Sequence, residues 1–174
     1  MTNTKNGTSS VLLVEDNADD VLLMQRAWTR AGVKVPLELV TDGDEALYYL
    51  QGAGQYADRR TFPFPSLVLT DLHLPGTNGF EILRWIRRES EMRGLVVIVL
   101  STSNRSSDIQ RAYQLGASSY LVKPSSWHGL TELVHDLDQY WLKWSSFATP
   151  PNKPQVPSTK TAVSNHHVSV LCKT

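Results

Sequence analysis

Short apolar runs alternate along the chain with longer amphipathic stretches. The runs are rich in β-branched residues and too short for helices, and they occupy residues 11–14, 37–40, 67–69, 95–100 and 120–122. Nearly continuous apolar runs of this length are typical of parallel strands that are covered on both faces. The pattern therefore predicts five buried strands.

Helical periodicity occurs between these runs. Apolar residues three or four positions apart follow the first, third and fourth runs, and two of these stretches close at Gly32 and Gly116. A last helix is expected from about Ser125, with apolar positions that extend to Trp144. Five successive strand–helix pairs predict an α/β fold in which helices cover both faces of a five-stranded parallel sheet.

The composition changes towards the C-terminal end. Residues 145–174 contain three lysines, no acidic residue and four of the nine prolines, with many Ser, Thr and Asn residues. A polar segment without an apolar period is predicted to be disordered, and we expect residues 1–9 to be a flexible N-terminus. The predicted domain therefore spans residues 10–144.

Charge and hydropathy exclude several classes of protein. The formal net charge is 0, which argues against a general nucleic-acid or membrane-surface binder. No apolar run approaches the roughly 18 residues that cross a bilayer, and the polar N-terminus is unlike a signal peptide. The one cysteine, Cys172, cannot form an internal disulfide. We expect a cytoplasmic protein.

Polar side chains follow four of the five predicted strands. Glu15 and Asp16 come after the first strand, Asp71 after the third, Ser101 after the fourth and Lys123 after the fifth. The carboxyl ends of parallel strands meet at one edge of the sheet. We therefore expect one crevice that contains three carboxylates, a hydroxyl and an ammonium.

This combination favours phosphoryl transfer. A single carboxylate after a strand is more often a helix cap, but three together repel one another unless a cation lies among them. Mg²⁺ suits such oxygen ligands and also takes phosphate oxygens. The ammonium and hydroxyl suit the other oxygens of a phosphoryl group, and the crevice offers no better nucleophile than a carboxylate.

The residues that carry these groups lie in strings that resemble the receiver domain of two-component response regulators. The strings are VLLVEDN, LVLTDLHLPGTNGFEIL, VIVLSTS and GASSYLVKP, within a similarity that spans about residues 11–144. The resemblance implies the flavodoxin-like, doubly wound (βα)5 fold and phosphorylation by a sensor histidine kinase. It also implies no enzyme activity beyond the chain's own phosphorylation and dephosphorylation.

The resemblance assigns the acidic residues to a phosphoacceptor and a Mg²⁺ site. Asp71 matches the phosphoacceptor. Asp16 matches the direct Mg²⁺ ligand, and Glu15 matches the ligand that acts through water. The main-chain carbonyl of His73 matches the third protein ligand, while a metal site built on the His73 side chain is the weaker alternative.

Other residues match the phosphoryl-binding groups and the switch of the family. Ser101, where threonine is commoner, and Lys123 match the groups that bind the phosphoryl oxygens. Tyr120 matches the aromatic residue whose rotamer follows the hydroxyl. The Lys123–Pro124 bond resembles the family's cis peptide, and Ser125 replaces the usual apolar residue, which leaves the start of the last helix open.

A long connection between the second and third strands indicates which members of the family the chain resembles most. Together with the Asn17-Asp19-Asp20 segment, residues 51–66 resemble the small stand-alone regulators that are partnered with phytochrome-type histidine kinases. The alternative for Phe62 and Phe64 in this connection is that they only pack it onto the domain. No second domain is expected after residue 144, so we expect a protein target downstream rather than nucleic acid or membrane.

Two other functions remain open from the residues. A haloacid-dehalogenase-type phosphatase also uses an aspartyl nucleophile on a parallel sheet, but it needs a second acid where this chain has His73. A degenerate receiver that serves only as a scaffold is the other alternative. The complete set of Glu15, Asp16, Asp71, Ser101 and Lys123 argues against it.

Aromatic residues continue past the apolar positions that the last helix needs. Tyr140, Trp141 and Trp144 predict an interface, because Trp and Tyr are enriched at interface centres. We expect a homodimer on the face formed by the fourth helix, the fifth strand and the fifth helix. The alternative is that these aromatics pack onto the connection that contains Phe62 and Phe64.

Overall fold

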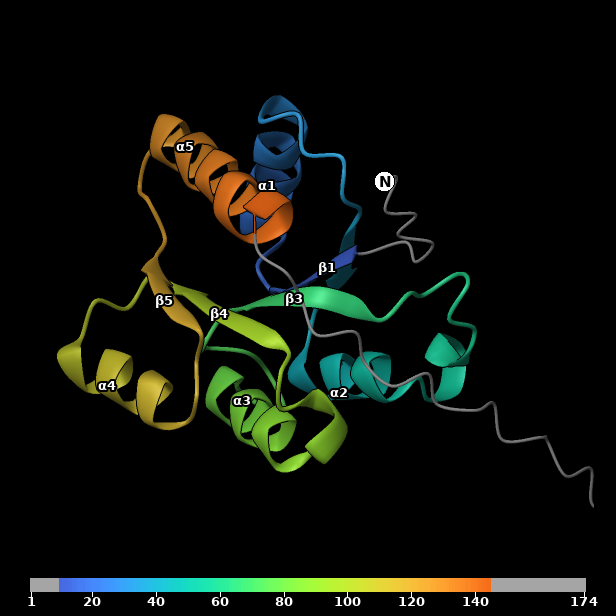
Figure 1. Ribbon diagram of the computed structural model, residues 1–174. Coiled ribbons are helices and arrows are strands. Elements are labelled where there is room, and N and C mark those ends of the chain that lie inside the picture. Colours follow the sequence, from blue (N-terminus) through green and yellow to red (C-terminus); the bar gives the residue numbers. More distant parts are fainter. Residues whose placement is uncertain (1–9, 145–174) are drawn as a thin grey trace, which may run out of the picture.

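One parallel sheet forms the centre of the computed structural model, which describes residues 10–144 (Figure 1). Its order is β2-β1-β3-β4-β5, and the strands are β1 (Ser10–Val14), β2 (Leu37–Val40), β3 (Pro65–Thr70), β4 (Val96–Ser101) and β5 (Ser119–Val122). The five-stranded parallel sheet predicted from the sequence is confirmed. The predicted N-terminal segment 1–9 and tail 145–174 lie outside the described residues.

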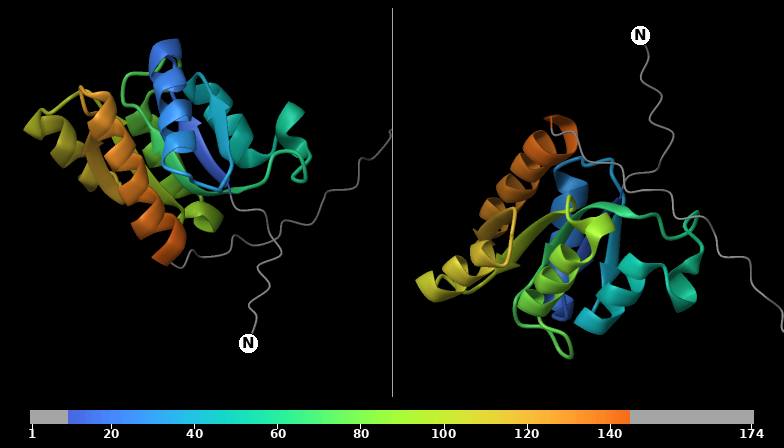
Figure 2. Two further views of the ribbon diagram at one scale, coloured as in Figure 1. Left: turned by 90° about the horizontal axis from the view of Figure 1, so that it is seen from above. Right: turned by 60° about the horizontal axis from the view of Figure 1, so that its bottom comes forward.

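Helices cover both faces of this sheet (Figures 1 and 2). One face carries α1 (Ala18–Arg30) and α5 (Trp127–Leu137), and the other carries α2 (Gly43–Gln51), α3 (Gly79–Arg88) and α4 (Ser106–Gln114). Shorter helical segments are Gly54–Ala57, Ser90–Met92 and Asp138–Trp144, the last of which continues α5. The doubly wound α/β architecture is therefore confirmed.

The core has one layer on each side of the sheet, because successive strand side chains point to opposite faces. Val11 and Leu13 of β1 pack in the layer beneath α1 and α5. Leu12 and Val14 pack in the layer beneath α2 and α3. Both layers are almost fully buried, so β1 lies rigidly at the centre of the sheet and fixes the position of the residues that follow it.

Polar caps fix the helices that border the carboxyl edge of the sheet. The Asn17 side chain accepts hydrogen bonds from the backbone N–H groups of Asp19 and Asp20 and begins α1. Asn78 begins α3 with a full capping box to Glu81. Ser126 caps α5, so the last helix begins at Trp127 rather than at Ser125.

The long connection between α2 and β3 packs against the core. Phe62 and Phe64 contact the layer beneath α2 and α3, and the Phe62 ring meets that of Tyr56 edge to face at 5.0 Å. Trp141 is partly buried and packs against the opposite layer, which lies beneath α1 and α5. The interpretation that the phenylalanines pack the connection down is therefore supported. The alternative that the C-terminal aromatics pack onto it is wrong for Trp141.

Within residues 10–144, no helix combines the length and the apolar character that a membrane span requires.

Candidate functional site

Glu15 follows β1 directly and is buried at the carboxyl edge of the sheet. Its backbone N–H donates to the Val40 carbonyl of β2 at 3.1 Å, so the sheet pairing continues through it. The Asn17 backbone N–H donates to Glu15 Oε1 at 3.3 Å. Asp16, one residue further, is exposed. The first turn after β1 therefore places one acid in the site and the other at its surface.

Asp71 follows β3, next to Glu15 in the sheet order. Its backbone N–H donates to the Val14 carbonyl at 3.1 Å, and its Oδ1 accepts hydrogen bonds from the backbone N–H groups of Leu72 and, at 3.3 Å, His73. Gly79 approaches so closely that a Cβ atom there would lie 2.1 Å from the Asp71 carbonyl oxygen. The loop after β3 and the start of α3 thus fix both the backbone and one carboxylate oxygen of Asp71.

Ser101 and Lys123 come from the two strands on the other side of Asp71. Ser101 ends β4 and is fully buried, and its carbonyl accepts a hydrogen bond from the Lys123 backbone N–H at 2.8 Å. In residues 10–144 every peptide bond is trans, so the expected cis Lys123–Pro124 bond is not found. The trans bond is compatible with the site, because β5 pairing through Ser101 already directs Lys123 towards the carboxylates.

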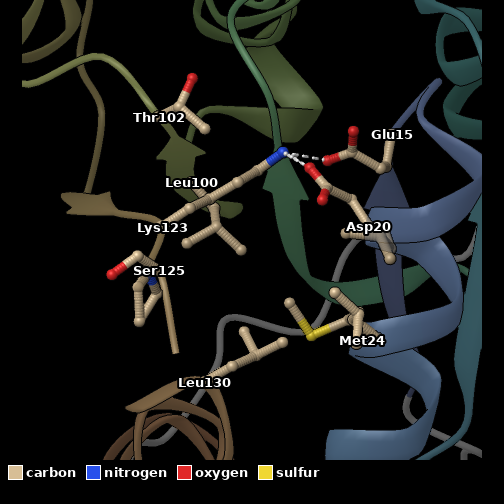
Figure 3. A pocket seen from close by; sticks show the side chains of 11 residues that line it. Glu15, Asp20, Met24, Leu100, Thr102, Lys123, Ser125 and Leu130 are labelled. Atoms are coloured by element: carbon tan, nitrogen blue, oxygen red, sulfur yellow. Dashed lines mark hydrogen bonds and ion pairs between the residues drawn. The ribbon is translucent and has the colours of Figure 1, made fainter. Parts of the chain in front are cut away.

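The Lys123 ammonium lies among three carboxylates. Lys123 Nζ is 2.6 Å from Glu15 Oε2, 2.8 Å from Asp71 Oδ2 and 2.8 Å from Asp20 Oδ2, and Figure 3 shows its approach to Glu15 and Asp20. Asp20 was not predicted as a site residue. A carboxylate in the first turn of a helix is ordinarily explained by the helix dipole, and no spacing rule links it to a lysine 103 positions away.

Burial and the ammonium have opposite effects on the carboxylates. Burial raises the pKa of Glu15 above its ordinary value despite the Lys123 ammonium, and the negative charge of Asp71 adds to the rise. Burial also opposes ionisation of Asp71, but Lys123, the Ser101 hydroxyl and the His73 N–H outweigh it and lower the pKa of Asp71. Burial disfavours the charged Lys123, yet its three carboxylate partners raise the pKa of Lys123. The site therefore favours an ionised Asp71 beside a charged Lys123.

The expected switch residue points inward. Tyr120 is buried with Leu72, Phe80 and Val99, and its hydroxyl donates to the Ser103 carbonyl at 2.8 Å. This places the ring between Asp71's loop and the loop after β4, beside Ser101. The position suits a side chain that responds to movement of the Ser101 hydroxyl.

The acidic donor set fits a hard divalent cation chemically. Glu15 and Asp71 already face one positive charge, and their oxygens are the ligand type that Mg²⁺ prefers. Within residues 10–144, no group of three His, Cys, Asp or Glu side chains is arranged as a metal site, because the Lys123 ammonium lies between Glu15 and Asp71 and Asp16 points to the surface. The same finding leaves the alternative of a His73-based metal site without support.

A cavity of about 450 Å³ adjoins Lys123 between α1 and the start of α5 (Figure 3). Its walls combine the charged groups of Glu15, Asp20 and Lys123 with apolar side chains such as Met24 and Leu130. Solvent therefore reaches the Lys123 ion pairs from the side of α1.

The predicted dimer face is only partly exposed. Tyr140 is 63% exposed and meets the Trp141 ring edge to face at 4.9 Å. Trp141 itself packs against the core beneath α1 and α5, because the helical segment after α5 turns it inward. Trp141 is therefore only partly exposed, and the Trp144 side chain lies outside the described part of the chain.

Comparison with known proteins identifies the same architecture. The family model for the response regulator receiver domain matches residues 11–135. The probable methanogenesis regulatory protein FilR2 of Methanothrix harundinacea is 38% identical over 80% of this chain and 88% of its own length. Response regulator Rcp1 of Synechocystis sp. is 32% identical over 82% of this chain and 95% of its own length.

Solved structures with a similar fold are also response regulators. The response regulator RPA3017 in red light signalling of R. palustris has a TM-score of 0.78 and 36% identity over 81% of this chain and 99% of its own. The phosphorylated cyanobacterial phytochrome response regulator RcpA has a TM-score of 0.73 and 35% identity over 82% and 100% of the two chains. The Mn²⁺-bound form of Rcp1 has a TM-score of 0.72 and 30% identity over 81% and 99%.

Proposed function

The chain belongs to the family of response regulator receiver domains, and we propose that it accepts a phosphoryl group on Asp71 from the phosphohistidine of a sensor histidine kinase. The observation that carries the proposal is the position of Asp71. Its carboxylate is buried, ionised and paired at 2.8 Å with Lys123. The Lys123 ammonium can also stabilise the negative charge of a phosphoryl oxygen bound to Asp71.

The transfer is a simple substitution at phosphorus. A carboxylate oxygen of Asp71 forms the new O–P bond while the N–P bond of the phosphohistidine breaks. The electron pair of that bond returns to the imidazole nitrogen, which takes up a proton from solvent. Lys123 stabilises the charge on the phosphoryl oxygens, and the buried Ser101 hydroxyl donates a hydrogen bond to one of them.

We assign the divalent cation to Glu15, Asp16, Asp71 and the main-chain carbonyl of His73. When bound, Mg²⁺ would neutralise charge on the acceptor and on the phosphoryl oxygens. Support comes from the oxygen donors that meet at the carboxyl edge of the sheet and from the Mn²⁺-bound structure of Rcp1.

We propose a phytochrome-type histidine kinase as the donor. Two of the solved relatives are described with red light signalling or as a phytochrome response regulator, and they cover more than four fifths of this chain. The methanogenesis-related FilR2 is of similar identity, so the kinase must be tested directly. We further propose a cytoplasmic location, output by binding a protein target, and no enzyme activity beyond the chain's own phosphorylation and dephosphorylation.

Labelling by a kinase tests the phosphoacceptor and the donor together. An autophosphorylated phytochrome-type kinase carrying ³²P, prepared in red light and in far-red light, is mixed with the chain and Mg²⁺. We expect transfer whose extent depends on the light state, and none to Asp71→Asn, which keeps the shape of the side chain but loses the nucleophile. Acetyl phosphate serves as a donor that is independent of the kinase.

The outcomes separate the possibilities. Label from acetyl phosphate but not from the kinase would leave the phosphoacceptor in place and reject the phytochrome partner. Equal label on wild type and Asp71→Asn would reject Asp71 as acceptor. No label from either donor would favour the degenerate scaffold. Because the chain belongs to the receiver family, the haloacid-dehalogenase-type phosphatase is no longer an alternative.

A further inference from the structure

Asp20 is a third carboxylate on Lys123, and no role described so far uses it. Its Oδ2 lies 2.8 Å from Lys123 Nζ, the same distance as that of Asp71 Oδ2. Its backbone N–H donates to the Asn17 side chain at 3.1 Å, which fixes it in the first turn of α1. The helix cap thus holds the backbone of Asp20 while the side chain reaches into the site (Figure 3).

Lys123 has no hydrogen-bond donor to spare in this arrangement. A protonated lysine offers three N–H groups, and Glu15, Asp20 and Asp71 accept one bond each, at 2.6, 2.8 and 2.8 Å. A phosphoryl oxygen that arrives at Asp71 can therefore gain an N–H of Lys123 only if one carboxylate gives it up.

Asp20 is the partner that can be released most easily. Its side chain is 37% exposed, whereas those of Glu15 and Asp71 are 4% and 10% exposed. Water in the adjoining cavity, which Asp20 lines, can replace the ammonium at an exposed carboxylate. A buried carboxylate that loses the ammonium has no such replacement, so exchange at Glu15 costs more free energy.

We propose that Asp20 is a positioning residue that competes with the phosphoryl group for Lys123 and thereby slows the phosphorylation of Asp71. This inference rests on the proposed function of Asp71 as acceptor. Asp20 acts through the lysine, because it occupies an N–H group that the phosphoryl oxygens need.

The test is the initial rate at which acetyl phosphate labels Asp71 in the presence of Mg²⁺. In this reaction an Asp71 oxygen forms the O–P bond, the bridging O–P bond of acetyl phosphate breaks, and acetate leaves with the electron pair. Asp20→Asn keeps the size of the side chain and the backbone N–H used by the helix cap. We expect it to be labelled about threefold to tenfold faster than wild type.

Asp19→Asn is the matched control. Asp19 lies in the same turn of α1, its backbone N–H binds the same Asn17 oxygen, and its side chain is not among the partners of Lys123. The variant removes the same charge and should stay within about twofold of wild type, because exposed charges interact weakly across water. Melting temperatures establish that all variants are folded.

Two further measurements identify the route of the effect. In a Lys123→Gln background, Asp20→Asn should give no acceleration, because the residue acts through the lysine. Calorimetric titration with Mg²⁺ alone should give the same affinity for Asp20→Asn as for wild type. A direct role of Asp20 as a metal ligand would instead weaken that affinity.

The inference is overturned if Asp20→Asn is labelled no faster than wild type, if Asp19→Asn is accelerated equally, or if acceleration persists without Lys123. Loss of Mg²⁺ affinity in Asp20→Asn would also overturn it. Each of these results leaves Asp71 labelled in wild type and so leaves the proposed function standing. A wild-type chain that takes no label overturns the proposed function, and this inference with it.

Discussion

Two carboxylates that share one ammonium have pKa values that shift in opposite directions, because their other surroundings differ. Glu15 and Asp71 both lie within 2.8 Å of Lys123 Nζ, yet burial raises the pKa of Glu15, whereas Lys123 together with additional donors lowers that of Asp71. Those donors are the Ser101 hydroxyl and the His73 N–H. The proposed acceptor is thus the carboxylate whose ionised form the site favours.

The backbone beneath Asp71 depends on the absence of a side chain at Gly79. A Cβ there would lie 2.1 Å from the Asp71 carbonyl oxygen and 3.0 Å from the Leu72 Cα, and backbone atoms cannot move aside cheaply. We expect Gly79→Ala to lower the free energy of unfolding by about 1–3 kcal/mol. Urea denaturation measures the loss, and slower labelling by acetyl phosphate would report displacement of the acceptor.

Gly32→Ala provides the comparison for this prediction. Gly32 has a left-handed φ of 72°, but a Cβ there meets nothing within 4 Å. The Gly32→Ala variant therefore introduces backbone strain without a steric clash. Acetyl phosphate should label this variant at the wild-type rate. A loss of stability in Gly79→Ala no greater than that in Gly32→Ala, with normal labelling, would show that the close approach is unimportant.

The sequence located the reactive residues because strand ends are easy to recognise in a doubly wound sheet. Glu15, Asp71, Ser101 and Lys123 all follow apolar runs, and the structure brings them to one edge. The contact of Asp20 was missed because it depends on the angle between α1 and β5, which no local pattern encodes. The predicted cis bond at Lys123 was wrong for a different reason, because it rested on resemblance alone.

The strands were predicted from the sequence more completely than the helices. The five strands agree with the predicted runs to within two residues, but the sequence interpretation assigned no residues to α2. The signal for α2 was present as an acid followed by a glutamate three positions later. Asp42 accepts from the Glu45 backbone N–H at 2.7 Å, and Glu45 accepts from the Thr41 N–H at 3.2 Å.

Arg59 joins the long connection to the end of α2. Its guanidinium donates to the Tyr49 and Leu50 carbonyls at 2.8 Å each and to the Phe62 carbonyl at 3.3 Å. The Tyr49 and Leu50 carbonyls lie in the last turn of α2, where the hydrogen bonds of the helix itself run out, and the Phe62 carbonyl lies in the connection. We expect Arg59→Ala to lower the free energy of unfolding by about 2 kcal/mol, measured by urea denaturation, because charged hydrogen bonds to buried groups are lost.

Arg60→Ala is the natural control for the Arg59 prediction. Arg60 is exposed and adjacent, so its removal changes the net charge equally but should alter stability by less than about 0.5 kcal/mol. Phosphorylation of both variants should remain at the wild-type rate, because the connection lies on the side of the sheet away from Lys123. Equal losses for the two variants would contradict the role given to Arg59.

At the scale of the whole molecule, exposed apolar groups are unevenly distributed. Of the seven large exposed hydrophobic residues between 10 and 144, Leu22 and Leu23 lie on α1 and Tyr48 lies on α2. The other four belong to α4, β5, α5 or the segment that continues α5, and they are Tyr113, Val122, Trp127 and Tyr140. We therefore retain the proposal of a homodimer through this side of the molecule, with Tyr140 rather than Trp141 as its C-terminal aromatic.

Sedimentation velocity of the full chain, with and without beryllofluoride as a phosphoryl mimic, tests this dimer. We expect a dimer at micromolar concentrations that Tyr140→Ser combined with Val122→Thr weakens about tenfold or more, because both side chains would lose apolar contact across the interface. Trp141→Ala is unsuitable, since that side chain packs against the core and its removal would destabilise the fold.

Tyr48→Ser is the control, because Tyr48 is 57% exposed, close to the 63% of Tyr140, but lies on α2, away from the proposed interface. A monomeric wild type in both states, or equal weakening by Tyr48→Ser, would rule this interface out.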